Sequence, residues 1–351
     1  MMGSALGGAV LLNACGTGGG GAPAAPPTAA APATLDEIVA AAEAEGGDLI
    51  WYLPGQADTA QALQEAFKAK YPFTNPQVQS LVFRDMANKL ITESITGAPT
   101  ADVFMLPSPF RQIFLDNDVV VPTTVPAEQA LPQDLLDPDG FAHPVYILLI
   151  TTIYNTNSMP SGPPKPADMA DPQWAGKIAF DRVQGLGQST MWLASWRNQM
   201  GDAEWVRWLD GLQANDIFVT GSGGDTYAAV LRGDRAFGIG SSNDINAQEP
   251  GTPMAADFSY PPVPFVQNLW LTRQAAHPAT GRLFIEWALG EDGQQTLAST
   301  GRSPVLQTVD SPVSVSTLLP EGIEPLPGTE LRDFFGRTNE YVSILDAKWP
   351  G

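Results

Sequence analysis

The sequence is poor in cysteine and histidine. Its 351 residues include one cysteine, Cys15, and two histidines, His143 and His277. One thiol cannot form an internal disulfide bond, and two histidines with a single thiol cannot supply a His/Cys zinc site. We therefore predict no disulfide framework, no metal site and no cofactor.

Basic residues are also scarce. Lys and Arg number 18 against 38 Asp and Glu, which gives a formal net charge of −20 at pH 7. A surface this acidic repels phosphate backbones, so nucleic-acid binding is not expected. The charge favours solubility and identifies no ligand by itself.

Long hydrophobic runs are missing after residue 34. A membrane-spanning helix needs about 18 or more consecutive apolar residues, whereas the longest run here, VYILLI at 145–150, has the length of a strand. The amino terminus differs, because an apolar segment at 5–12 is followed by small residues and Cys15. Such a segment is typical of a secretory signal.

Residues 12–15, Leu-Asn-Ala-Cys, resemble a bacterial lipobox, in which the cysteine is acylated and becomes the first residue. Asn13 stands where a smaller residue is more usual, and no Lys or Arg precedes the apolar run, which a start site further upstream would explain. We predict a lipoprotein signal at 1–15 with lipidation of Cys15. Residues 16–34 are Gly, Ala, Pro and Thr without charge, and they predict a disordered tether. The alternative is a disordered amino end with an incidental cysteine.

Signatures of catalysis are lacking as well. The turn at 221–223 has no G-x-S-x-G nucleophile elbow, and both histidines precede proline in expected loops. We therefore predict a binding protein and not an enzyme. A secreted α/β enzyme and a structural or adhesion lipoprotein are the alternatives from other classes. Gly-rich loops between strand ends and helix starts disfavour the second of these.

Strands and helices alternate along the rest of the chain. Thr34 is the expected N-cap of the first helix. The expected strands cover 48–53, 78–83, 101–106, 176–180, 217–220 and 236–241. The expected helices cover 35–45, about 59–72, 85–97, a short one at 110–117, 186–201, 202–215, 225–234, 279–290, 291–301 and about 330–345. This alternation implies βαβ units and a mainly parallel sheet.

Two longer extended stretches, near 145–155 and 260–272, divide this series. We predict an α/β fold of two Rossmann-like lobes with mainly parallel sheets, joined by extended hinge strands. Lobe 1 would comprise 35–150 and about 268–351, and lobe 2 about 151–267. No internal sequence repeat is visible.

The order of these pieces resembles the extracytoplasmic solute-binding proteins of ABC importers, in particular the branch that binds ferric ion, thiamine, polyamines and phosphonates. The stretches that carry the resemblance are DLIWYLPGQADTAQALQEAFKAKYP (48–72), TGAPTADVFMLPS (96–108), ITTIYNTN (150–157), WAGKIAFDRVQGLGQS (174–189), VLRGDRAFGIGSSND (230–244) and LFIEWALGEDGQQTLASTGRSPV (283–305). The resemblance implies the type II periplasmic binding protein fold, in which two lobes close on a ligand by hinge motion. It also implies an extracytoplasmic, lipid-anchored monomer whose partners are a small-molecule solute and an ABC permease.

The ferric-ion ligand set of that branch is absent. By position, its histidine falls near Ala57, its glutamate near Pro107, and its two tyrosines on Asn243 and Asp244. None of these residues has the required type, because ferric iron prefers anionic oxygen ligands. Ferric binding with the ligand set of the family is therefore not expected.

The candidate ligand-binding residues follow expected strand ends, where a cleft is expected in this architecture. Gly187, Gln188 and Ser189 would lie at a helix amino end, where N–H groups and the helix dipole suit an anion. Arg84 and Arg182 would add bidentate contacts. The full set is Gln56, Asp58, Arg84, Ser108, Arg182, Gly187, Gln188, Ser189, Ser241, Ser242, Asn243 and Asp244.

Other interpretations of these residues stay open. Ser189 would serve as an ordinary helix cap, and the two arginines would be solvated surface charges. Asp58, Asp225 and Asp244 would suit a thiamine- or polyamine-like cation, and iron held by a non-standard ligand set is a further possibility. The loop and the arginines favour a small organic anion. Most of the aromatic residues on the strands are expected in the core, with one or two at strand ends contacting a ligand: Trp51, Tyr52, Tyr146 and Trp270.

Overall fold

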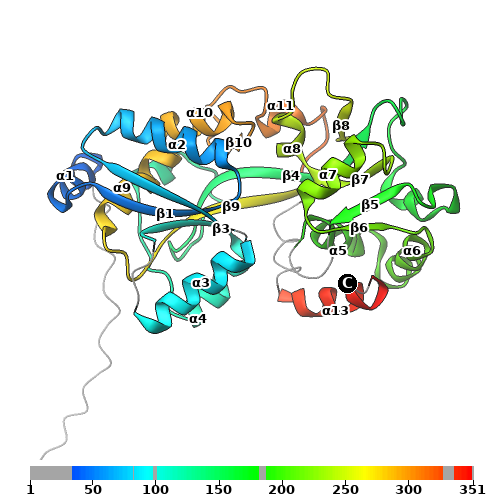
Figure 1. Ribbon diagram of the computed structural model, residues 1–351, viewed down its shortest axis with the longest axis horizontal. Helices are drawn as coiled ribbons and strands as arrows, with labels where there is room; N and C mark the ends of the chain where they lie inside the picture. Colours follow the sequence, from blue (N-terminus) through cyan, green and yellow to red (C-terminus); the bar gives the residue numbers. More distant parts are fainter. Residues whose placement is uncertain (1–33, 82, 98–100, 182–186, 327–335, 350–351) are drawn as a thin grey trace, which may run out of the picture. The chain divides into compact units, whose positions relative to one another are not determined.

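The first helix begins where its sequence caps it. Thr34 accepts a hydrogen bond from the Glu37 amide, and the Glu37 carboxylate accepts one from the Thr34 amide. This capping box starts α1 (Leu35–Glu45), and Gly46 ends it in a left-handed conformation at φ 107°. The computed structural model (Figure 1) describes residues 34–81, 83–97, 101–181, 187–326 and 336–349. Cys15, the predicted signal and nearly all of the predicted tether lie outside these residues.

A first group of parallel strands follows α1. Its elements are β1 (Asp48–Pro54), α2 (Ala57–Lys70), β2 (Asn75–Leu81), α3 (Phe83–Thr96) and β3 (Val103–Pro107). β1 lies in the middle and pairs in parallel with both β2 and β3. The helices connect strands that run the same way, as the alternation of strands and helices predicts.

A second group of parallel strands has the same spatial order. Its elements are β5 (Ile178–Asp181), α5 (Gln188–Met200), α6 (Asp202–Ala214), β6 (Phe218–Thr220), α7 (Gly223–Leu231) and β7 (Phe237–Ser241). β5 lies in the middle and pairs in parallel with β6 and β7. Each group therefore places its first strand between its second and its third.

Two long strands join the groups. β4 (His143–Asn155) follows the first group in sequence but pairs antiparallel with β7, and β9 (Val263–Leu271) follows the second group but pairs antiparallel with β3. β4 and β9 also pair with each other, so the strand order is β2-β1-β3-β9-β4-β7-β5-β6 (Figure 1). Two short strands, β8 (Met254–Asp257) and β10 (Ser303–Pro304), pair with β4 and were not expected from the sequence. The predicted extended crossings are thus confirmed as the strands that link the two parallel groups.

The remaining helices cover the sheet and end the chain. They are α4 (Arg111–Asp116), α8 (Ser242–Asn246), α9 (Pro278–Leu289), α10 (Glu291–Ser299), α11 (Val315–Leu318) and α13 (Thr338–Lys348), with short 3-10 helices at Ser108–Phe110, Pro126–Ala130, Pro166–Ala170 and Pro172–Trp174. Among the described residues, no helix has both the length and the apolar character that crossing a bilayer would require.

The core is rich in buried aromatic side chains. Phe67 packs edge-on against Phe284 with ring centroids 5.1 Å apart, and Trp51 lies 5.0 Å from the same ring. Trp270 donates from Nε1 to the Leu106 carbonyl at 2.7 Å. Trp51, Tyr146 and Trp270 are all fully buried, which confirms the expectation that most of these aromatics belong to the core.

The end of the chain packs on the second group of strands and helices. α13 contacts α5 and α6, and its Tyr341 lies edge-on to Trp205 at 5.8 Å. Trp349 packs edge-on against Phe180 of β5 at 6.0 Å. The division into two lobes stays a prediction, and within it these contacts assign α13 to the side of the second group.

Candidate functional site

Segments from distant parts of the chain meet along one edge of β4. β9 occupies one edge of this strand, and β10 and β7 both pair with the other edge. Both pairings are antiparallel, so the residues before Ser303 converge with those after Ser241. Asn246 Nδ2 donates to the Gly301 carbonyl at 3.3 Å, which joins the two segments directly.

Gln56 connects the start of α2 to this junction. Its backbone has a left-handed conformation, φ 56°, which is uncommon for a residue other than glycine. Its Nε2 donates to the Tyr146 hydroxyl at 2.9 Å, and its Oε1 accepts from Arg302 Nε at 3.1 Å. Because a guanidinium only donates, the second bond fixes Oε1 on the side of Arg302.

Tyr146 is the fully buried centre of the cluster. Burial raises the pKa of its hydroxyl, so the phenol is neutral at physiological pH. Gln267 lies directly opposite Tyr146 on β9, and side chains at such opposed positions share one face of the sheet. Gln267 is buried, and its Oε1 has no hydrogen-bond partner among the residues described.

Arg302 is a buried cation, with only 6% of its surface exposed. Nη1 donates to the Thr300 carbonyl at 3.0 Å, and Nη2 lies 3.9 Å from Asp58 Oδ1, beyond hydrogen-bond distance. The Asp58 carboxylate is mostly exposed and therefore compensates the charge weakly. Buried charges are normally paired, and in the described part of the chain no carboxylate hydrogen-bonds to this guanidinium. An anion would complete its coordination.

The residues after β7 supply acceptors on the opposite side of the junction. Ser241 Oγ donates to Asp244 Oδ2 at 2.9 Å, and the Leu149 amide donates to Ser242 Oγ at 3.0 Å. Asn243 is buried, and its Oδ1 has no partner in the described ranges. Burial raises the pKa of Asp244, while bonds from Ser241 and the charge of Arg302 act in the opposite direction.

The helix start at Gln188 differs from the expectation. The Gln188 and Ser189 amides donate to the two Asp181 carboxylate oxygens at 2.9 and 2.6 Å, and Asp181 is buried. The interpretation that these amides are free for an anionic ligand is therefore wrong, because a carboxylate of the protein itself occupies them. Ser189 is not the cap either, since Gly187 holds that position without a side-chain bond.

The other predicted site residues are dispersed. Arg182 and the side chain of Arg84 lie outside the described residues. Ser108 Oγ accepts from Asn268 Nδ2 at 2.9 Å, beside the end of β3. Asp225 lies in the first turn of α7, where Ser222 is the N-cap and accepts from the Asp225 amide at 3.2 Å. The structure thus brings Gln56 and Asp58 together with the segment at 241–244 through Arg302 and Tyr146.

Two residues of the cluster were missed as polar groups. Tyr146 was considered only as an aromatic, and Arg302 was not singled out in the stretch TGRSPV. The signal available in the sequence was an arginine directly after a glycine, Gly301. In the structure, Gly301 has φ 80° and the arginine directly precedes the first residue of β10. The pairing of that strand with β4 is a long-range contact, and no local pattern reveals it.

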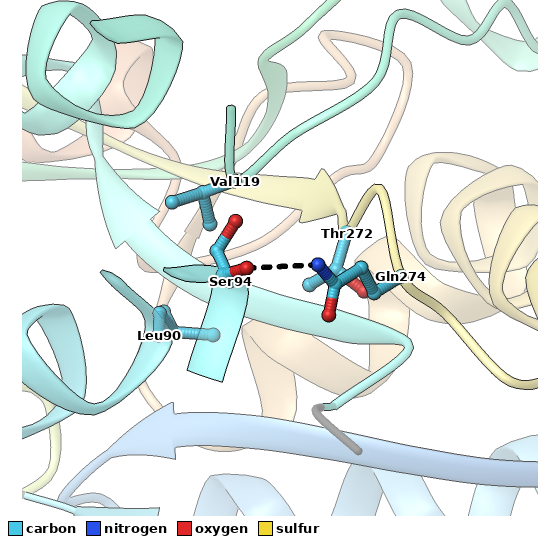
Figure 2. Close-up of a pocket in the computed structure, with 5 residues that line it drawn as sticks. All are labelled: Leu90, Ser94, Val119, Thr272 and Gln274. Carbon is cyan, nitrogen blue, oxygen red and sulfur yellow. Dashed lines mark hydrogen bonds between the residues drawn. The ribbon is translucent and has the colours of Figure 1, made fainter. Parts of the chain in front are cut away.

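Two surface hollows lie away from this cluster. Figure 2 shows the smaller one, where Gln274 Nε2 donates to the Ser94 carbonyl at 2.9 Å between α3 and the end of β9. It is too small to admit a water molecule. The larger hollow, of about 510 Å³, is open and lies over α2, α9 and α10. In the part of the chain that the structure describes, His, Cys, Asp and Glu form no group of three or more that could hold a metal ion.

Taken together, two parallel strand groups with exchanged long strands and polar groups at their carboxyl ends define a type II periplasmic binding protein fold. The sequence profile described as bacterial extracellular solute-binding protein matches residues 62–319, and the chain belongs to this family. It is therefore an extracytoplasmic solute-binding protein of the transport class. A comparison with curated proteins finds no match.

Solved structures share the fold at low sequence identity. Iron-bound HitA from Pseudomonas aeruginosa is 17% identical, with a TM-score of 0.70 over 86% of this chain and 99% of that chain. AfuA from Actinobacillus pleuropneumoniae, solved with fructose-6-phosphate, is 17% identical, with a TM-score of 0.72 over 86% and 98%. The substrate-binding protein of an ABC transporter from Agrobacterium tumefaciens is 16% identical, with a TM-score of 0.69 over 85% and 96%.

Proposed function

We propose that this protein captures a small organic solute with an anionic group at the cluster of Gln56, Tyr146, Asp244 and Arg302. The observation that carries the proposal is the buried Arg302 guanidinium, which lacks a hydrogen-bonded carboxylate in the described ranges. The start of α2 lies beside it, and a helix amino end adds a favourable field for an anion. The helix start at Gly187, Gln188 and Ser189 does not support an anionic solute, because its amides donate to Asp181. The buried charge of Arg302 does support one.

A cationic solute is the second candidate. Asp58 and Asp244 both lie near Arg302, so the cluster has more acidic than basic groups. This arrangement would favour a thiamine- or polyamine-like amine if Asp244 were the main contact. Iron is a weaker candidate, because Arg302 repels a metal ion and the described residues offer no group of three metal-binding side chains.

Arg302→Gln tests the anionic contact. The variant keeps much of the side-chain volume but removes the charge, and hydrogen bonds to charged groups contribute about 1.5–3 kcal/mol. We expect binding of the best anionic solute to weaken by about tenfold to a hundredfold, with a smaller loss for Arg302→Lys. Titration calorimetry after a thermal-shift screen of carboxylates, phosphates, amines, sugars and metal ions would measure this.

Arg207→Gln is the matched control, since Arg207 is an exposed residue of α6 that pairs with Glu204 within the same helix. It should leave binding unchanged. Equal affinities of the wild type and Arg302→Gln for every solute that binds would contradict the proposed site.

We further propose that the protein delivers its solute to an ABC permease and is held at the membrane by acylated Cys15. The lipobox-like residues 12–15 and the uncharged segment at 16–34 support the anchor. Lobe closure about β4 and β9, in a monomer, would present the occupied form to the permease. Loss of Cys15 in Cys15→Ala should move the protein from the membrane fraction to the soluble fraction, and unchanged fractionation would refute the anchor.

A further inference from the structure

Beside β4, where the segments before Ser303 and after Ser241 converge, one side chain supplies hydrogen-bond donors and several others supply acceptors. Arg302 provides N–H groups on one side. On the other side, Asn243 Oδ1 and Gln267 Oε1 are buried without partners in the described ranges. The Asp244 carboxylate adds a further acceptor, which holds one bond from Ser241.

An anion alone would leave these acceptors unsatisfied. A buried acceptor without a donor costs free energy, and an anion close to Asp244 would add repulsion. A cation alone would satisfy the acceptors, but it would leave the buried Arg302 without a partner. A solute with both charges would match each side of the junction.

We infer that the solute of this protein is amphoteric, with a carboxylate that binds Arg302 and an ammonium group that binds Asp244, Asn243 and Gln267. An ammonium offers three N–H donors, one for each of the three acceptors. A carboxylate accepts two parallel bonds from a guanidinium, and its single charge suits a site where Arg302 is the one cation among the described residues and acids lie nearby. This inference rests on the proposed function and narrows its substrate class to amino carboxylates.

Contacts between the two sides support a shared site. Asn246 joins α8 to Gly301, directly before Arg302. Burial raises the pKa of Asp244 and the charge of Arg302 opposes this rise, and the charges of both residues also act on the pKa of Tyr146, so the three groups lie within electrostatic range of one another. Gln267 shares the face of the sheet on which Tyr146 lies.

The test uses the purified full-length protein and three series of probes of graded chain length. These are ω-amino carboxylates together with α-amino acids, the matching carboxylates without an amine, and the matching alkylamines. We expect an amino carboxylate to bind at least about tenfold more tightly than either matching probe, because each charged contact contributes about that factor. Titration calorimetry gives the ratio of the dissociation constants.

Asp244→Asn should reduce the preference for the amino carboxylate over the carboxylate by about tenfold. Asp234→Asn is the control, since Asp234 is an exposed carboxylate after α7 that pairs with Arg232 at 2.7 Å. It belongs to no candidate site, so the preference should not change.

The outcomes separate the inference from the proposed function. If carboxylates bind as tightly as amino carboxylates and Asp244→Asn changes nothing, the amphoteric class is wrong while the Arg302 site stands. If alkylamines bind best and Arg302→Gln has no effect, both are wrong. If no carboxylate-bearing probe binds, the amphoteric class is wrong, and the proposed anionic contact fails as well when no phosphate binds either.

Discussion

At the residue scale, Asp181 shows how one carboxylate decides whether a helix start is available to a ligand. It is buried at the end of β5, and it accepts from the first two amides of α5 while its own amide donates to Ser189 Oγ at 3.0 Å. The helix dipole at this point already acts on a negative charge of the protein. A helix start that is favourable for an anion in sequence therefore already binds a carboxylate of the protein itself.

Asp181→Asn should lower the free energy of unfolding by about 1–3 kcal/mol, because one oxygen acceptor is replaced by the NH2 donor of the carboxamide, which faces a helix amide. Urea unfolding followed by tryptophan fluorescence would measure the change. Solute affinity should stay the same, since the amides of α5 are not part of the proposed site. Weaker solute binding without loss of stability would indicate that this helix start contacts the solute after all.

At the element scale, Gly301 allows the segment before β10 to approach α8. It has φ 80°, and a Cβ at this position would lie 3.2 Å from the Ala247 nitrogen and 3.2 Å from the Asn246 carbonyl carbon. Both neighbours are backbone atoms that cannot move independently of the helix. The glycine thus lets the residue before Arg302 lie against the end of α8.

Gly301→Ala should destabilise the protein through backbone strain and through this collision. Gly233→Ala is the matched control, because Gly233 has the same φ of 80° and ends its helix with the same pattern of amide bonds, but no atom lies within 4 Å of the added Cβ. Strain alone costs about 1–2 kcal/mol in both variants, and overpacking should add about 1–3 kcal/mol to Gly301→Ala only. Equal losses in urea unfolding would show that the contact with α8 does not constrain the segment.

The elements with local signals could be predicted from the sequence, and the elements that depend on pairing could not. Thr34 with Glu37 specifies the start of α1, and alternating strands and helices specify both parallel groups. β8 and β10 are too short to show a period, and only their partner β4 makes them strands. Arg302 precedes β10, so its place in the candidate site was hidden for the same reason. Gln56 and Asp244 were found because each lies within three residues of the end of a strand that the sequence does reveal.

At the scale of the whole molecule, the two halves repeat a topology that the sequence does not repeat. In each half, the first strand lies between the second and the third. The long strand that follows one half in sequence pairs antiparallel with the third strand of the other half: β4 pairs with β7, and β9 pairs with β3. Such a repeat needs only matching hydrophobic periods and connection lengths, which different residues can supply. The exchange of β4 and β9 gives the halves two continuous covalent links through the sheet, and the proposed solute site lies beside one of them.

The last helix is attached to the second half by charge as well as by packing. Arg197 of α5 pairs with Glu340 of α13 at 2.7 Å and with Asp202 at 2.8 Å, and its guanidinium lies over the Tyr341 ring. Arg337 pairs with the same Glu340 at 2.8 Å. Hydrogen bonds from Arg337 and Arg197 lower the pKa of Glu340 from 4.5 to about 2.

This lowered pKa predicts how the attachment of α13 depends on pH. A carboxylate with a lower pKa in the folded state stabilises that state above its unfolded pKa of 4.5, and the contribution is lost as pH falls toward about 2. Hydrogen exchange of the peptide over α13, corrected for intrinsic rates, should therefore show less protection at about pH 3 than at about pH 5. Glu340→Gln should remove this difference, whereas Glu204→Gln, which breaks an exposed pair within α6, should retain it. Protection of α13 that does not change with pH in the wild type would mean that Tyr341 and Trp349 hold the helix without help from the ion pairs.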